Sequence, residues 1–207
     1  IVYSTKTVST GDDGCISFMP ETPVFSFDDK ITFYPAPVSS EASVIKAAYD
    51  ASVSAPFRVR TDFTKKNGIV YVFDYNEDGK VMTNSPYILR EMINAGVKVG
   101  NSPISTSSYL SKPVESLYKA TFNIVGNIYG FMVSGTIKYA SPVTQLENGK
   151  YSCSLTADIT CIDMSDGSVL YVTHQTETAE AESKYKAIDN CKLALSVKTA
   201  NAVLYGM

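Results

Sequence analysis

Apolar and polar positions alternate most regularly between Lys150 and His174, in KYSCSLTADITCIDMSDGSVLYVTH. A period of two residues is typical of a strand with one buried and one exposed face. The segment SDGS, Ser165 to Ser168, contains the Asp-Gly pair that favours a tight hairpin turn. We therefore predict a hairpin whose first strand runs to about Ile162 and whose second strand is Val169 to Thr173. The face expected to be buried carries Tyr151, Cys153, Leu155, Ala157, Ile159 and Cys161, and the opposite face carries Ser152, Ser154, Thr156, Asp158 and Thr160.

Three segments show helical signals. A first helix is expected to begin at Ser39 or Ser40, in SSEASVIKAAYDAS, with Pro56 as its far limit. A second is expected over Ser85 to Gly96, because Pro follows an N-capping Ser and Gly fits the left-handed position after the helix. A third should run from about Ala179 to Leu204.

The third helix carries two apolar stripes instead of one. The first contains Ala181, Ile188, Cys191, Leu195 and Ala202, and the second contains Leu193, Val197 and Leu204. A surface helix normally has one such stripe. Neighbouring layers of the same domain or a protein partner would cover the second stripe, and a few exposed apolar side chains would also be ordinary. We take Leu193, Val197 and Leu204 as the candidate interaction surface.

The remaining pattern predicts an α+β protein, with helices packed on a mostly antiparallel sheet and a long C-terminal helix. We divide the chain into a β-rich N-terminal arm or extension, residues 1–38, and an α+β domain, residues 39–207. Further strands are expected at Ile31 to Tyr34, Phe57 to Phe63, Ile69 to Tyr75, Val97 to Val99, Ala120 to Val125 and Phe131 to Tyr139.

Composition narrows the class of protein. The chain has 207 residues, of which 44% are hydrophobic and 19% charged, so it can form a core and is not of the disordered class. No run approaches the roughly 20 apolar residues of a spanning helix. The net charge of −3 comes with scattered Lys and Arg, so we expect no nucleic-acid partner.

No catalytic signature stands out, and we expect neither an enzyme nor catalytic residues. His174 is the one histidine, so a Ser-His-Asp or Cys-His site would have to use it. It follows a predicted strand, and no nucleophile-elbow pattern such as GxSxG lies near it. We interpret it as an exposed strand residue.

DYNEDG, Asp74 to Gly79, is a weak candidate calcium loop. Asp74, Asn76, Asp78 and Gly79 match the first, third, fifth and sixth positions of such a loop. The twelfth position falls on Ser85, which cannot supply the usual bidentate carboxylate. The alternative is a polar turn between two strands. We therefore expect no cofactor, with calcium as the one candidate.

Four cysteines, Cys15, Cys153, Cys161 and Cys191, allow three complete pairings. In one strand Cys153 and Cys161 would lie about 26 Å apart at about 3.3 Å per residue, too far for a bridge. Buried free thiols are the simplest interpretation. In an exported protein, a bridge from either one to Cys191 or Cys15 remains open.

The last third of the chain resembles a group of bacterial envelope lipoproteins. FMVSGTIKY, with Val133, Gly135 and Ile137, is followed by the alternating strand, by a turn with Asp163, Ser165 and Gly167, and by a long helix. This order is similar to that of the curli secretion channel protein, the outer-membrane activators of penicillin-binding proteins, the LPP20-type lipoproteins and the flagellar assembly protein T. Asp166 is an extra residue in the turn, and the loops at 140–149 and 175–180 are too short for membrane-crossing hairpins.

The resemblance implies a non-enzymatic scaffold or assembly protein, exported to the periplasm or the outer membrane. Its partners would be other proteins or further copies of itself. A removed signal peptide is compatible with a numbering that opens on Ile1, and a lipid anchor upstream of Ile1 would be the link to a membrane. The alternatives are a structural subunit of a virion, tail or filament, and a calcium-dependent binding module.

Overall fold

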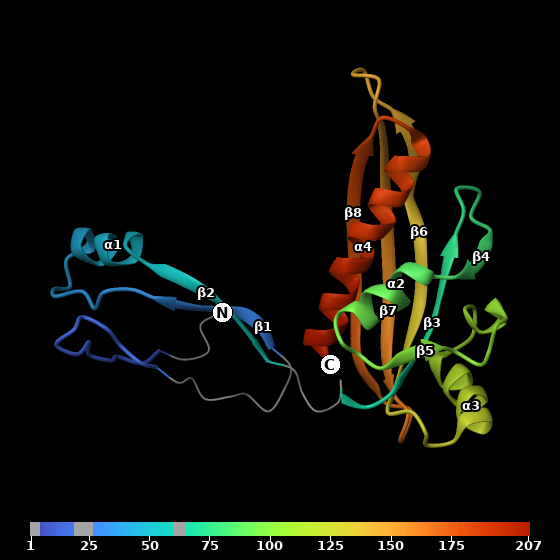
Figure 1. Cartoon of the computed structure of the whole chain (residues 1–207), viewed down its shortest axis with the longest axis horizontal. Coiled ribbons are helices and arrows are strands. Elements are labelled where there is room, and N and C mark those ends of the chain that lie inside the picture. The colour runs from blue at the N-terminus through green and yellow to red at the C-terminus, as the bar shows by residue number, and fades with distance from the viewer. Residues whose placement is uncertain (1–4, 19–26, 60–64) are drawn as a thin grey trace. The chain divides into compact units, whose positions relative to one another are not determined.

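The computed structural model describes residues 5–18, 27–59 and 65–207, which form two compact units, Ile1–Val59 and Arg60–Met207 (Figure 1). Our division placed the end of the N-terminal region at residue 38. The packing places the boundary after Val59, so the first predicted helix belongs with the N-terminal unit.

The N-terminal unit is built around two antiparallel strands and one helix. Strand β1 (Phe27–Phe33) pairs with β2 (Val53–Val59), from Phe27 opposite Val59 to Phe33 opposite Val53. Helix α1 (Ala42–Asp50) connects them, as the sequence predicted. The predicted strand Phe57 to Phe63 overlaps the end of β2, and its part beyond Val59 lies outside the described residues.

The C-terminal unit contains a six-stranded sheet in the order β4-β3-β6-β7-β8, with β5 paired to β3 (Figure 1). Strand β3 runs parallel to β5 and β6, and the other pairs are antiparallel. The predicted hairpin is therefore present as β7 and β8. The strand bounds are β3 (Gly68–Tyr75), β4 (Val81–Asn84), β5 (Val99–Asn101), β6 (Phe131–Gln145), β7 (Tyr151–Asp163) and β8 (Val169–Ala181).

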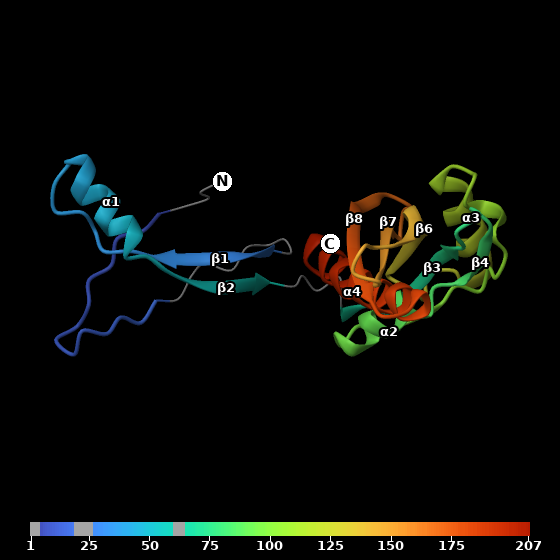
Figure 2. The same cartoon turned by 90° about the horizontal axis from the view of Figure 1, so that it is seen from above.

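Helices cover both faces of this sheet. On one face α4 (Lys184–Gly206) lies along β7 and β8 and also packs against α2 (Pro86–Asn94) (Figure 2). On the other face lie α3 (Val114–Val125) and the short 3₁₀ helix η2 (Ser107–Tyr109). The α+β class with a mostly antiparallel sheet and a long C-terminal helix is confirmed.

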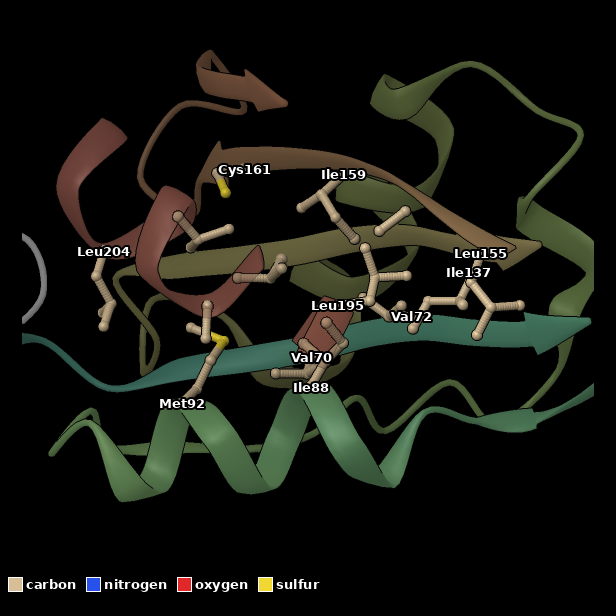
Figure 3. Close-up of a cluster of buried hydrophobic side chains, with 14 of the residues drawn as sticks. Val70, Val72, Ile88, Met92, Ile137, Leu155, Ile159, Cys161, Leu195 and Leu204 are labelled. Atoms are coloured by element: carbon tan, nitrogen blue, oxygen red, sulfur yellow. The ribbon is translucent and has the colours of Figure 1, made fainter. Parts of the chain in front are cut away.

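Strand β3 shows why there are two hydrophobic clusters. Its sequence GIVYVFDY is apolar on both faces, as expected for a strand that is covered on both sides. Val70 and Val72 join α2, α4 and the inner side of β7 in the larger cluster (Figure 3). Because successive side chains alternate, Ile69, Tyr71 and Phe73 point into the second cluster with α3.

The close approach of β6 and β7 explains the glycine in FMVSGTIKY. A Cβ atom on Gly135 would lie 2.0 Å from the backbone oxygen of Asp158 in the neighbouring strand. Any other residue would therefore force the two strands apart. In the hairpin turn, Gly167 has a φ of +80°, and a Cβ there would meet the Tyr118 ring at 2.6 Å.

The strand predicted at Ala120 to Val125 is wrong, because these residues form the second half of α3. The segment is rich in β-branched and aromatic residues, which favour strands. However, its buried residues Leu117 and Thr121 lie four positions apart, on one face of a helix, and pack against the second cluster. Tertiary packing therefore decides the conformation here.

The strands of the hairpin are longer than predicted, and the last helix begins later. Strand β8 continues through residues that we placed in a loop and a helix, because its pairing with β7 extends from Thr173 to Ala181. Likewise β6 extends to Gln145, into the loop predicted at 140–149. Helix α4 starts at Lys184, where the side chain of Ser183 accepts a hydrogen bond from the Lys186 backbone.

Candidate functional site

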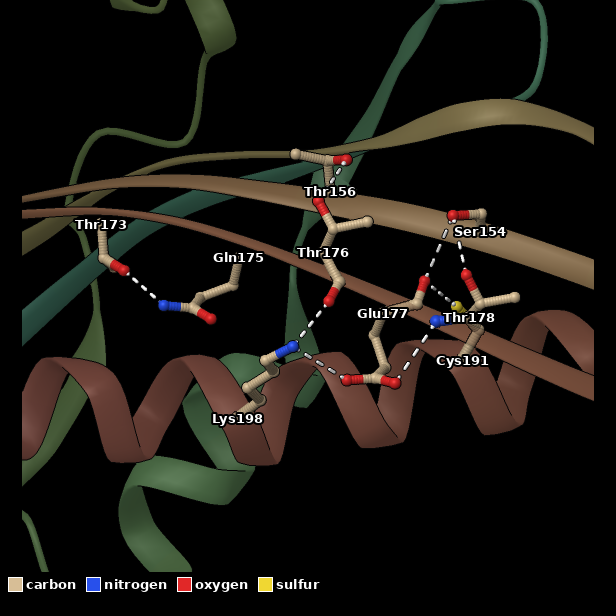
Figure 4. A network of polar contacts seen from close by, with 9 residues as sticks. All are labelled: Ser154, Thr156, Thr173, Gln175, Thr176, Glu177, Thr178, Cys191 and Lys198. Atoms are coloured by element: carbon tan, nitrogen blue, oxygen red, sulfur yellow. Dashed lines mark hydrogen bonds and ion pairs between the residues drawn. The ribbon is translucent and has the colours of Figure 1, made fainter.

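The polar side of the β7–β8 hairpin forms a ladder of hydroxyl groups across the two strands (Figure 4). The Thr178 hydroxyl donates to Ser154 Oγ at 3.0 Å, and the hydroxyl oxygens of Thr156 and Thr176 lie 3.3 Å apart. These pairs are direct cross-strand neighbours in the sheet. We call Ser154, Thr156, Thr176 and Thr178 the hydroxyl face. It matches the polar side that the alternation predicted.

His174 continues this ladder toward the hairpin turn. It lies opposite Asp158, and its Nδ1 is 2.6 Å from Asp158 Oδ1. The side chains are 67% and 55% exposed respectively, so the pair lies open on the surface of the sheet. This position agrees with our interpretation of His174 as an exposed strand residue.

The candidate interaction surface on α4 divides into two parts. Leu193 and Val197 are each 41% exposed on the side of the helix that faces away from the sheet. Leu204 is fully buried and belongs to the same hydrophobic cluster as Met92 and Val97. A pattern along one helix could not reveal that α2 and the following segment cover the end of α4. We therefore remove Leu204 from the candidate interaction surface. The two residues that remain, Leu193 and Val197, are called the exposed α4 pair.

The candidate calcium residues lie at the turn between β3 and β4. Asp74 is buried, and its Oδ2 forms an ion pair with Lys192 Nζ at 2.7 Å. Asn76 Oδ1 accepts a hydrogen bond from the backbone of Lys80 at 2.8 Å, which closes the turn. Asp78 accepts from the Asn76 amide at 3.5 Å. The arrangement has the features of the polar turn that was our alternative, and calcium binding stays a prediction.

Around Asp74, the structure brings together polar residues that are distant in the sequence. Lys192 lies on α4 and also places its ammonium group 5.8 Å from the centre of the Tyr87 ring of α2. The Tyr87 hydroxyl donates to Asp189 Oδ1. This hydrogen bond, together with burial, raises the pKa of Tyr87 to about 12. The cluster therefore ties α2, α4 and β3 together at the covered side of the sheet.

Glu77 extends this cluster to the surface. It binds Lys184 at 2.7 Å and accepts a hydrogen bond from the Val143 backbone at 3.2 Å. The hydrogen bond from Lys184 is the largest cause of the lowered pKa of Glu77. Sequence reasoning missed this whole cluster, since Asp74 and Lys192 are 118 positions apart and no local motif connects them.

A hollow of about 280 Å³ adjoins Glu77. This volume lies just below the roughly 300–1,000 Å³ of typical ligand pockets. Tyr139 lines it, and burial is the main cause that raises the pKa of Tyr139 to about 12. Lys138 places its ammonium group 5.0 Å from the centre of the Tyr75 ring. The lining residues are Tyr75, Asn76, Glu77, Gly79, Lys138 and Tyr139.

The described ranges 5–18, 27–59 and 65–207 lack two further features that would indicate a function. They contain no group of three or more His, Cys, Asp or Glu side chains placed to hold a metal ion. None of the helices described there combines the length and the apolar character needed to cross a membrane.

Several solved bacterial structures are similar to this chain at low identity. The PelC dodecamer of Paraburkholderia phytofirmans is 14% identical, with 86% of this chain and 98% of that chain covered and a TM-score of 0.39. A Neisseria meningitidis lipoprotein is 13% identical, with 65% and 99% covered and a TM-score of 0.37. A hypothetical protein of Chlamydia trachomatis is 11% identical, with 68% and 96% covered and a TM-score of 0.41. No curated protein matches the chain.

A family model described as "TP0693-like lipoprotein, C-terminal domain" matches residues 67–204, which is nearly the whole C-terminal unit. The lipoprotein character expected from the last third of the chain is thereby confirmed. The finer likeness to the curli, LPP20-type and flagellar proteins stays a prediction. The chain belongs to the TP0693-like lipoprotein family and is an exported protein associated with the cell envelope.

Proposed function

We propose that the C-terminal unit is a non-enzymatic assembly or scaffold module of the cell envelope, which acts by contact with other proteins or with further copies of itself. The observation that carries this proposal is the exposed α4 pair. Leu193 and Val197 lie one helical turn apart, so they form one continuous apolar strip beside the solvent.

The packing of α4 makes this strip notable. The helix already packs on β7 and β8 with one side and on α2 with another. The domain therefore holds the exposed side of α4 rigid. A partner that covers this side would cause little loss of conformational entropy in the helix. The hydroxyl face supplies a second, polar surface on the opposite side of the hairpin.

The test replaces both residues of the exposed α4 pair with Asp. Leu193→Asp with Val197→Asp should abolish complexes of the full chain, because burying two carboxylates in an apolar contact is unfavourable. The measurement is the molecular mass of the envelope-extracted protein by light scattering. The matched control, Asn123→Asp with Asn127→Asp, adds the same two charges to exposed positions at the end of α3, on the other face of the sheet, and should keep the complexes.

Unchanged mass in the Leu193/Val197 variant would contradict the proposal, as would a wild-type protein that is monomeric and without partners. Circular dichroism should show that both variants keep the fold, because neither pair belongs to the buried core.

The other two hypotheses receive less support. Membership of a lipoprotein family favours the envelope over a virion, tail or filament. In a calcium-dependent module, the ion would have to compete with the Lys192 ammonium group for the Asp74 carboxylate. It would also have to compete with the Lys80 backbone N–H for Asn76 Oδ1. That module predicts a rise in melting temperature on addition of calcium, which a chelator reverses.

A further inference from the structure

Two cysteine side chains meet between the sheet and its covering helix. Cys153 lies on the covered face of β7, where its strand partner is Ala179 of β8. Cys191 lies on α4, above the same strands. Both are fully buried, and both belong to the larger hydrophobic cluster. Two segments that are distant in the sequence thus place their thiols in one part of the core.

The two cysteines lie over the same stretch of the β7–β8 pair. The Cys191 thiol donates to the backbone oxygen of Glu177 at 3.3 Å, beneath the hairpin (Figure 4). The interaction between the two thiols is also the largest cause that raises the pKa of Cys153 and lowers that of Cys191. Glu177 lies two residues along β8 from Ala179, the strand partner of Cys153, so the Cys191 sulfur is held against the same part of the sheet as Cys153.

The other two cysteines lack such a neighbour in the same unit. Cys161 lies eight positions along β7 from Cys153, about 26 Å in an extended strand. Burial alone raises the pKa of its thiol to about 12. Cys15 is exposed and belongs to the N-terminal unit. Of the pairings that the sequence left open, the geometry of the C-terminal unit selects one.

We propose that Cys153 and Cys191 are joined by a disulfide bond in the exported protein. This bond depends on the export that the lipoprotein family establishes and not on the proposed assembly role, because disulfides persist in oxidising compartments such as the bacterial periplasm. A buried position also shields the finished bond from reductants.

The chemistry is thiol–disulfide exchange during folding, before the core closes. The thiolate of one cysteine attacks the disulfide of an envelope oxidoreductase and forms a mixed disulfide, with release of one oxidoreductase thiolate. The thiolate of the second cysteine then displaces the other sulfur. Cys153 and Cys191 together lose two protons and two electrons, and the oxidoreductase is left as a dithiol.

The bond would fasten α4 to the sheet. It closes a loop that contains the rest of β7, all of β8 and the first turns of α4. By the chain-entropy argument, such a loop stabilises the folded state chiefly by restricting the unfolded chain. For a chain of this size we expect the melting temperature to fall by about 10 °C on reduction.

The direct test uses the full chain, exported to the envelope and purified without reductant. The protein is denatured in iodoacetamide, and its peptides are then mapped by mass spectrometry. Cys15 and Cys161 should be alkylated, whereas Cys153 and Cys191 should appear as one linked peptide pair about 2 Da lighter than the sum of the two thiols. Alkylation of all four cysteines before reduction, or linkage of Cys153 or Cys191 to another cysteine, would overturn the proposal.

Variants add a measurement that does not depend on peptide mapping. Reductant should lower the melting temperature of the wild type and of Cys161→Ala, which removes a buried thiol outside the pair. It should leave the double variant Cys153→Ala with Cys191→Ala unchanged. A drop of equal size in that double variant would contradict the proposed bond.

Discussion

The two units of this chain differ sharply in how much of each is buried. Among the described residues of the N-terminal unit, Ala48 is the one buried hydrophobic side chain, while Val38 and Val53 are 94% and 69% exposed. The C-terminal unit has two hydrophobic clusters, one on each face of its sheet. The contrast is between a ribbon with a helix and a layered domain.

This difference shows where the chain obtains its stability. The contacts within the N-terminal unit are mainly surface contacts, such as the Tyr34 and Tyr49 rings with centres 4.7 Å apart and the Thr32–Ser54 hydroxyl pair at 2.8 Å. A two-stranded ribbon of this kind is marginal by itself. We infer that the C-terminal unit folds independently and that the N-terminal unit adds little to its stability.

The largest effect is expected at the closest contact in the C-terminal sheet. Gly135→Ala should lower the free energy of unfolding by more than about 4 kcal/mol, because the new methyl group would overlap the Asp158 backbone oxygen. Gly100→Ala in β5 is the control, since a Cβ there meets nothing within 4 Å. Chemical denaturation measures both, and equal values for the two variants would disprove the close approach.

Core truncation should separate the two units directly. Leu195→Ala in α4 removes a fully buried side chain and should cost roughly 2–5 kcal/mol. Val53→Ala in β2 removes a mostly exposed one and should change the free energy of unfolding by less than about 0.5 kcal/mol. If Val53→Ala destabilised the protein as much as Leu195→Ala, the N-terminal unit would share the main core.

The buried ion pair should have a smaller effect than the core. Lys192→Met leaves the Asp74 carboxylate without its partner and should cost about 2–3 kcal/mol in urea unfolding. Asp74→Asn added to Lys192→Met should recover much of the loss, since no buried charge remains. The matched control is Lys198→Met, which breaks the more exposed pair with Glu177 and should cost less than about 1 kcal/mol.

The smallest expected effect appears only at high pH. The pKa of Tyr87 is about 12 in the folded protein against an ordinary value of 10.0. Because the folded state holds this proton more tightly, the stabilisation from Tyr87 is complete below pH 10 and is lost as the pH rises to about 12. Tyr87→Phe should make the decline in unfolding free energy across that window shallower. An unchanged slope would mean that the bond to Asp189 does not hold the proton.

Some parts of the fold could be predicted because their signals are local. The hairpin followed from strict alternation and an Asp-Gly turn, and α2 followed from Ser85, Pro86 and Gly96. Both are confirmed as β7 with β8 and as α2. These features depend on a few adjacent residues, whose backbone preferences act whatever surrounds them.

Other parts depended on contacts that no local pattern reveals. The segment TFNIV in α3 favours a strand by composition, but it is helical because Leu117 and Thr121, on one face of that helix, pack against the second cluster. Leu204 shares its helical stripe with Leu193 and is nevertheless buried, because α2 and the segment after it cover the end of α4. The Asp74–Lys192 pair and the Cys153–Cys191 contact required the whole topology, since β3, β7 and α4 are assembled from distant parts of the chain.

Hydrogen exchange on the full chain tests the central claim most directly, because it measures the stability of each segment in one sample. We predict that the amides of β6, β7 and α4 exchange only on global unfolding. The amides of β1, β2 and α1 should exchange at least about 100-fold faster, through local opening. Equal protection in the two groups would contradict the account, since it would make the N-terminal unit part of the same cooperative core.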